Sequence, residues 1–143
     1  MPKAQRTIVI DRPVDQVFAF FCDPSNDLKW RTHAKEIAAD GPPRVGSTIH
    51  QVIEGPGGRG IPADIRVTAY DPPSRYGFQV IGGPVRPVGE FRFTPTGNAT
   101  QVSFSLAADL GGMKKWLMSR PVQKSMEAEM ASLDKAKTII EAG

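Results

Sequence analysis

A change of pattern along the chain most constrains the fold. From 46 to 109, short runs rich in β-branched and aromatic residues alternate with turns that contain Gly and Pro, whereas the segment after Pro121 repeats apolar residues at helical spacing. The connections between these runs are short, which favours antiparallel strands. The pattern predicts one curved sheet covered by one C-terminal helix, with a hollow between them.

The expected strands share β-branched or aromatic content and turn residues at both ends. They span residues 7–10, 46–53, 61–70, 75–81, 88–94 and 100–109. The alternation is clearest in the last two, where Phe91 and Phe93 on one strand and Val102, Phe104 and Leu106 on the other are expected to point to one buried face. This face requires a cover.

A helix is expected immediately after the first strand. Asp11 is a candidate cap and Pro13 suits a first helical turn, and an apolar stripe follows at Val14, Val17, Phe18 and Phe21. The break at 23–26 then introduces a second short helix, which carries Leu28 and Trp30.

At the other end of the chain, Pro121 is expected to separate a short helix at 113–118 from the long covering helix, because proline lacks a backbone donor. The covering helix has its apolar face at Met126, Met130, Leu133 and Ile140.

Composition narrows the class of protein. With 143 residues, the chain is expected to form one domain, 1–143. A net charge of +3 is scattered rather than gathered on one segment, which argues against a nucleic-acid partner, and no apolar run reaches the length of a membrane span. The single cysteine, Cys22, and the lack of a signal peptide favour a cytoplasmic location. A homodimer is left open.

Several motifs, in order and at these intervals, resemble those of the START-like (SRPBCC) superfamily, within its polyketide cyclase/dehydrase-like branch. They are Arg12-Pro13-x-x-x-Val17-Phe18, Asp23-Pro24 followed by Trp30, Val45-Gly46, Tyr70-Asp71-Pro72-Pro73-x-Arg75 and Thr94-Pro95-x-Gly97-x-x-Thr100-x-Val102. The resemblance spans nearly the whole chain. It implies an α+β helix-grip fold: a curved antiparallel sheet wrapped around a long C-terminal helix, with two short helices inserted after the first strand.

The resemblance also implies an elongated, mostly apolar cavity between the sheet and the last helix. Unbranched methionines adapt to irregular ligands, so the methionines of the final helices are candidate walls, although methionine also fills ordinary cores. Met126 is the better candidate, whereas Met130 favours the core. The candidate ligand-binding residues are Phe21, Trp30, Tyr76, Phe78, Phe91, Phe93, Phe104, Trp116, Met126 and Met130.

Three polar side chains are weak candidates for catalysis. Tyr76 shares strand parity with Phe78, so its hydroxyl is the best candidate for a polar group in the pocket. His50 lies on an expected strand, but alternation along the strand does not say which face points inward. Either Ile49 or His50 can point to the core. His33 shares a face with Trp30 only if the helix continues that far.

Other chemistries lack the residues they need. Cys22 has no neighbouring base to activate it, and the spacing of Cys22, His33 and His50 does not match a metal site, so neither a metal nor a cofactor is expected. The glycine-rich segment 55–60 lacks the Lys and Ser/Thr of a phosphate loop and is interpreted as a hairpin loop that gates the cavity.

Three functions remain open at this point. The first is sequestration of a small hydrophobic molecule, such as a lipid, a polyketide-like aromatic or an isoprenoid. The second is a cyclase- or dehydratase-like enzyme that uses the same cavity and needs a polar side chain inside it. The third is a protein-interaction domain, which a closed interior would favour. The lack of an identifiable acid/base pair favours the first.

Overall fold

The computed structural model describes residues 2–39, 41–83, 85–110 and 112–143, with the side chains of these residues except 56 and 112–118. The strands form one antiparallel sheet in the order β1-β8-β7-β6-β5-β3-β2, and β4 pairs with β3. Their bounds are β1 Lys3–Ile10, β2 Ala34–Ala39, β3 Thr48–Glu54, β4 Gly60–Pro62, β5 Ile65–Asp71, β6 Arg75–Val80, β7 Val88–Thr96 and β8 Ala99–Ala107.

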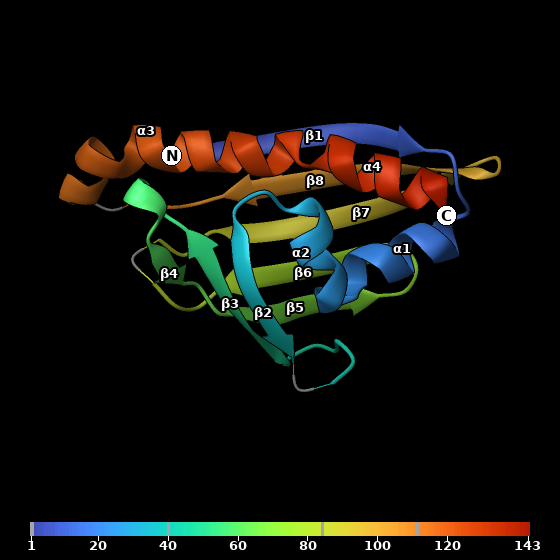
Figure 1. Cartoon of the computed structure of the whole chain (residues 1–143), viewed down its shortest axis with the longest axis horizontal. Helices are drawn as coiled ribbons and strands as arrows, with labels where there is room; N and C mark the ends of the chain where they lie inside the picture. Colours follow the sequence, from blue (N-terminus) through green and yellow to red (C-terminus); the bar gives the residue numbers. More distant parts are fainter. Residues whose placement is uncertain (1, 40, 84, 111) are drawn as a thin grey trace.

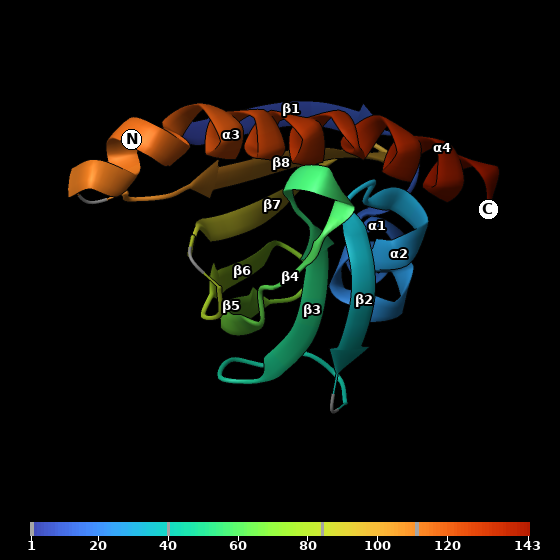
Figure 2. The same cartoon turned by 60° about the vertical axis from the view of Figure 1, so that its left-hand side comes forward.

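The helices complete the expected architecture. Their bounds are α1 Val14–Cys22, α2 Asp27–Trp30, α3 Gly112–Ala131 and α4 Leu133–Ala142, with 3₁₀ turns at Pro24–Asn26 and Pro56–Gly58. In both views α3 and α4 run in line along the sheet, next to β1, while α1 and α2 lie together on the α4 side of the molecule (Figures 1 and 2). The predicted α+β fold, a curled sheet gripping a long C-terminal helical segment, is confirmed.

The alternating face of β7 and β8 is the centre of the core. Phe91 lies opposite Phe104 and Phe93 opposite Val102, and all four are buried together with Leu106. The prediction of a single apolar face is therefore confirmed, because residues at alternate positions share one side of a strand.

The prediction that Pro121 separates two helices is wrong. Helix α3 continues through Pro121, and the interruption comes at Ser132. A proline inside a helix removes only one backbone hydrogen bond, and packing of the flanking turns can outweigh that loss. At Ser132, the side-chain oxygen donates to the Ala128 carbonyl (3.0 Å) and contacts the Thr32 hydroxyl (3.1 Å), so this position ties the helix to the chain after α2.

Asp11, the expected cap of the first helix, does not cap α1. Pro13 is the residue before α1, and no side chain caps the helix. Instead the Asp11 N–H donates to the Glu141 carboxylate (2.8 Å), and the Arg12 guanidinium donates to the carbonyl oxygens of Glu141 and Gly143. The turn therefore holds the last turn of α4, where cationic donors are favourable.

The segments 34–39 and 61–70 also differ from expectation. Strand β2 is absent from the expected strands, because Ala34–Ala39 has Ile37 as its single β-branched residue and otherwise consists of Ala, Lys and Glu. Pairing with β3 places it in the sheet nevertheless. The run 61–70 is divided into β4 and β5 at Ala63 and Asp64, next to Pro62, which has no N–H for a sheet bond.

Candidate functional site

A cavity of about 420 Å³ lies between the sheet and α3. Most of its lining is apolar, and the strands β3, β5, β6, β7 and β8 supply its floor while α3 supplies its roof. This volume lies within the range of small-molecule sites, about 300–1,000 Å³. The expected hollow between sheet and helix is therefore present in the structure.

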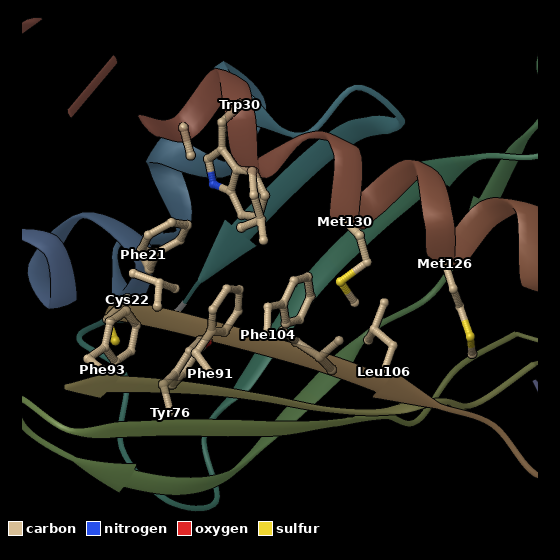
Figure 3. Packing of buried hydrophobic residues seen from close by; sticks show 14 of the residues in the cluster. Phe21, Cys22, Trp30, Tyr76, Phe91, Phe93, Phe104, Leu106, Met126 and Met130 are labelled. Atoms are coloured by element: carbon tan, nitrogen blue, oxygen red, sulfur yellow. The ribbon is translucent and has the colours of Figure 1, made fainter. Parts of the chain in front are cut away.

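Aromatic rings form the floor. The rings of Phe91 and Phe104 stack with their centroids 4.0 Å apart, and Tyr76 stacks on Phe91 at 6.2 Å. Phe21, from α1, packs against the other side of Phe91 at 5.1 Å. These four candidates, together with Phe78, line the cavity. Figure 3 shows the rings of Phe21, Tyr76, Phe91 and Phe104 on the sheet side of the helix.

Met126 is the methionine of α3 that lines the cavity. The residue is 3 % exposed, and its side chain points from α3 toward the sheet (Figure 3). Met130, one helical turn later, is also buried but does not line the cavity, and Phe93 packs on Phe18 and Phe91 outside it. The side chain of Trp116 lies outside the described residues.

The mouth of the cavity is marked by the lining residues that solvent reaches. They are Glu54 at the end of β3, Pro62 in β4, and Pro121, Lys124 and Ser125 in α3. Figure 2 shows the β3–β4 connection rising toward α3. The glycine-rich segment 55–60 is the expected hairpin loop, since it joins the antiparallel strands β3 and β4.

A cluster of charged side chains occupies the cavity wall at α2. The Nε and Nη2 groups of Arg31 donate to the Glu129 carboxylate at 3.0–3.3 Å. Its Nη1 group donates to Gln51 Oε1 at 2.9 Å and to Asp27 Oδ2 at 3.3 Å. All four residues line the cavity, so an otherwise apolar space has one polar wall.

Burial alters the protonation of this cluster. Desolvation raises the pKa of Asp27 to about 6, although Arg31 opposes the shift. For Arg31, burial alone would lower the pKa, but the carboxylates of Glu129 and Asp27 raise it overall, so the guanidinium stays charged. Burial also raises the pKa of Tyr76, with the charge of Asp27 adding to the effect, so its hydroxyl stays protonated at neutral pH.

Trp30 contributes both to the core and to the cavity lining. It is 2 % exposed, packs edge-on against Phe21 at 5.3 Å and also lines the cavity. Its indole N–H is buried and has no hydrogen-bond partner among the residues that the structure describes. It lies near enough to the Asp27 carboxylate to favour its charged form, but without the geometry of a hydrogen bond. The ring thus joins α2 to the core while one of its faces borders the cavity.

The two histidines lie in different surroundings. His33 lines the cavity, but α2 ends at Trp30, so the two residues do not share a helix face. His50 points away from the core, with its side chain 52 % exposed and its Nδ1 atom 2.8 Å from Asp64. Ile49 and Gln51 are the buried residues of β3, so the alternative that places His50 inward is wrong.

Neither the cysteine nor a metal-binding cluster is found among the cavity residues that the structure describes. Cys22 is buried, and burial raises the pKa of its thiol, which keeps it in the unreactive protonated form. Within the described ranges, no group of three or more His, Cys, Asp or Glu side chains is placed to hold a metal ion.

Sequence reasoning missed the four residues of the polar wall, although each left a signal. Asp27 and Arg31 are four residues apart, the spacing of helical ion pairs. Gln51 shares strand parity with Ile49, which is buried. Glu129 follows Met126 by three residues and lies on the same helix face. These signals are local, whereas the cluster joins three separate elements.

Similar proteins support the fold. A protein of Thermus thermophilus has a crystal structure that superposes with a TM-score of 0.81 at 19 % identity, covering 99 % of this chain and 98 % of that one. A START superfamily protein of Mycobacterium smegmatis superposes with a TM-score of 0.74 at 14 % identity, covering 98 % of this chain and 97 % of that one. The Zhui aromatase/cyclase of a Streptomyces species superposes with a TM-score of 0.73 at 14 % identity, covering 99 % of this chain and 97 % of that one.

No curated protein matches the sequence of this chain. Across the residues that the structure describes, no helix is both long and apolar enough to span a bilayer.

A family model identifies the chain. Residues 1–137 match the family described as polyketide cyclase / dehydrase and lipid transport. The chain therefore belongs to the polyketide cyclase/dehydrase and lipid transport family and has a START-like fold.

Proposed function

We propose that this chain binds a small hydrophobic molecule, such as a lipid, a polyketide-like aromatic or an isoprenoid, between its sheet and α3. The single observation that carries the proposal is the cavity of about 420 Å³, lined by Phe21, Phe91, Phe104 and Met126. Each 100 Å² of apolar ligand surface buried there contributes about 2.5 kcal/mol, before the losses of ordering and association. Binding needs no covalent step.

Substitution at Met126 tests the cavity. Met126→Trp places an indole where a thioether side chain now borders free space, so we expect at least tenfold weaker binding of the neutral dye Nile red. The matched control is Glu127→Trp, because Glu127 is exposed on the same helix and does not line the cavity. Dye fluorescence gives the affinity, and circular dichroism checks that both variants fold.

Equal dye affinity in the Met126→Trp variant and the wild type would contradict binding at this place. Native mass spectrometry of the protein purified from its own host addresses the ligand directly. A retained hydrophobic molecule would give its mass, and Met126→Trp should be recovered without it.

Proton transfer in the same cavity is the second candidate function. The observation that favours it is that Tyr76, whose hydroxyl stays protonated, and Asp27, whose pKa is about 6, both line this cavity. Such groups could assist a cyclisation or dehydration of a bound chain. Tyr76→Phe should then abolish turnover of a polyketide-like substrate and leave its binding unchanged, as measured by product analysis and dye displacement. Full turnover in the variant would remove Tyr76 from the reaction.

A further inference from the structure

The guanidinium of Arg31 has little left to offer a ligand. Two of its nitrogens are committed to Glu129 and the third donates to both Asp27 and Gln51. The side chains of Arg31, Asp27 and Glu129 are only 12 %, 17 % and 14 % exposed. A free buried arginine would attract a carboxylate ligand, but this one is already bound to two carboxylates of the protein.

The charges of the cluster do not cancel. Two carboxylates, Asp27 and Glu129, face one guanidinium, so the cluster carries a formal charge of −1 when both acids are ionised. The cavity lining also includes the cation Lys124 and the imidazole of His33, and Glu54 adds a further carboxylate at the mouth. Repulsion between like charges is strong where the surroundings are largely apolar.

Gln51 supplies a neutral donor to the same wall. Because arginine has only donors, the Gln51 oxygen must face Arg31, and this fixes the amide with its Nε2 group on the other side. Gln51 is 5 % exposed and lines the cavity, and its Nε2 group donates to none of the described residues. A ligand oxygen can accept from this group, and a ligand hydroxyl can donate to the carboxylates beside it.

We infer that the cavity selects uncharged, hydroxyl-bearing apolar molecules, alcohols or phenols, and disfavours carboxylate anions of the same size. The hydroxyl oxygen accepts from Gln51 Nε2, and its proton is donated to Asp27 or Glu129. The inference rests on the proposed binding function and adds the chemistry of the ligand's polar end.

A matched pair of ligands tests this selectivity. We would measure displacement of Nile red by 1-decanol and by decanoate at pH 8, where decanoate is ionised. Decanol should bind at least tenfold more tightly, a difference of about 1.4 kcal/mol. Because any apolar site disfavours a hydrated anion, the decisive quantity is how this ratio changes when the charge of the cluster changes.

The variant Glu129→Gln brings the formal charge of the cluster to zero and should reduce the decanol/decanoate ratio at least fivefold. Asp27→Asn makes the same charge change from α2 and serves if Glu129→Gln fails to fold. The control is Glu127→Gln, an equal change of net charge on the exposed face of α3, which should leave the ratio within twofold of the wild type.

Two results distinguish a failure of the selectivity from a failure of the binding function. If Nile red is taken up but decanoate binds as tightly as decanol, or if neither cluster variant alters the ratio beyond the control, the selectivity is overturned and the cavity function stands. If the wild type takes up neither the dye nor either ligand, the proposed binding function itself is overturned.

Discussion

Arg31 is the residue on which the polar wall of the cavity depends. It lies directly after α2, yet its guanidinium contacts Glu129 on α3 and Gln51 on β3. Buried ion pairs lose much of their attraction to desolvation, and apolar replacements are often as stable. A charged cluster at the wall of an apolar cavity is therefore better explained by ligand specificity and by the joining of three elements than by stability.

Asp27 should make the protein less stable as the pH rises. Its pKa of about 6 in the folded state exceeds its ordinary value of 3.8, so the folded state binds the proton more tightly than the unfolded state. The stabilising contribution is complete below about pH 4 and is lost as the pH rises through 6. Relative to the Asp27→Asn variant, the wild type should lose about 2 kcal/mol of unfolding free energy between pH 4 and pH 8.

Urea denaturation of both proteins at the two pH values measures this difference. Asp134→Asn is a control of opposite sign, because the hydrogen bond from Arg6 lowers the pKa of Asp134, so that its contribution is lost as the pH falls. A difference between Asp27→Asn and the wild type that does not change with pH would contradict the raised pKa.

At the scale of the elements, the pairing of β6 with β7 sets the shape of the cavity floor. Phe78 on β6 lies opposite Gly89 on β7, and the ring covers the glycine so closely that a Cβ there would overlap the tip of the ring. Phe78 also lines the cavity. The glycine therefore leaves room for a ring that would otherwise be displaced.

We expect Gly89→Ala to displace the Phe78 ring and so reshape the cavity. Overpacking of this kind lowers stability by about 1–3 kcal/mol, and dye affinity should fall several-fold. Urea denaturation and Nile red titration measure the two effects, with Thr94→Ala, an exposed position on the same strand, as control. Wild-type affinity in Gly89→Ala would show that the ring moves without entering the cavity.

At the scale of the whole molecule, the cavity exists because α3 is held at both sides of the sheet. On one side Lys3 of β1 exchanges two hydrogen bonds with Gln123, at 3.0 and 2.8 Å. On the other, Arg31 binds Glu129, one turn before the interruption at Ser132. Helix α3 is thus tied across the curled sheet, which leaves space between Met126 and the aromatic floor.

Much of this architecture could be predicted from local patterns. The alternation of Phe91 and Phe93, the helical stripe of Val17, Phe18 and Phe21 and the apolar spacing after Pro121 each reflect a period of the backbone itself. The same signals indicated Met126 and Tyr76 as cavity residues, because both lie on faces that a sheet-and-helix core must enclose.

Other elements depend on tertiary contacts. Strand β2 has little intrinsic strand preference and pairs with the edge of β3, and α3 continues through Pro121 although that residue lacks a backbone donor. The periodic elements, by contrast, follow from the sequence alone, since their causes lie within a few residues. The polar wall depends on the bond between Arg31 and Glu129, which lie 98 positions apart, so no local pattern specifies it and only folding brings its charges together.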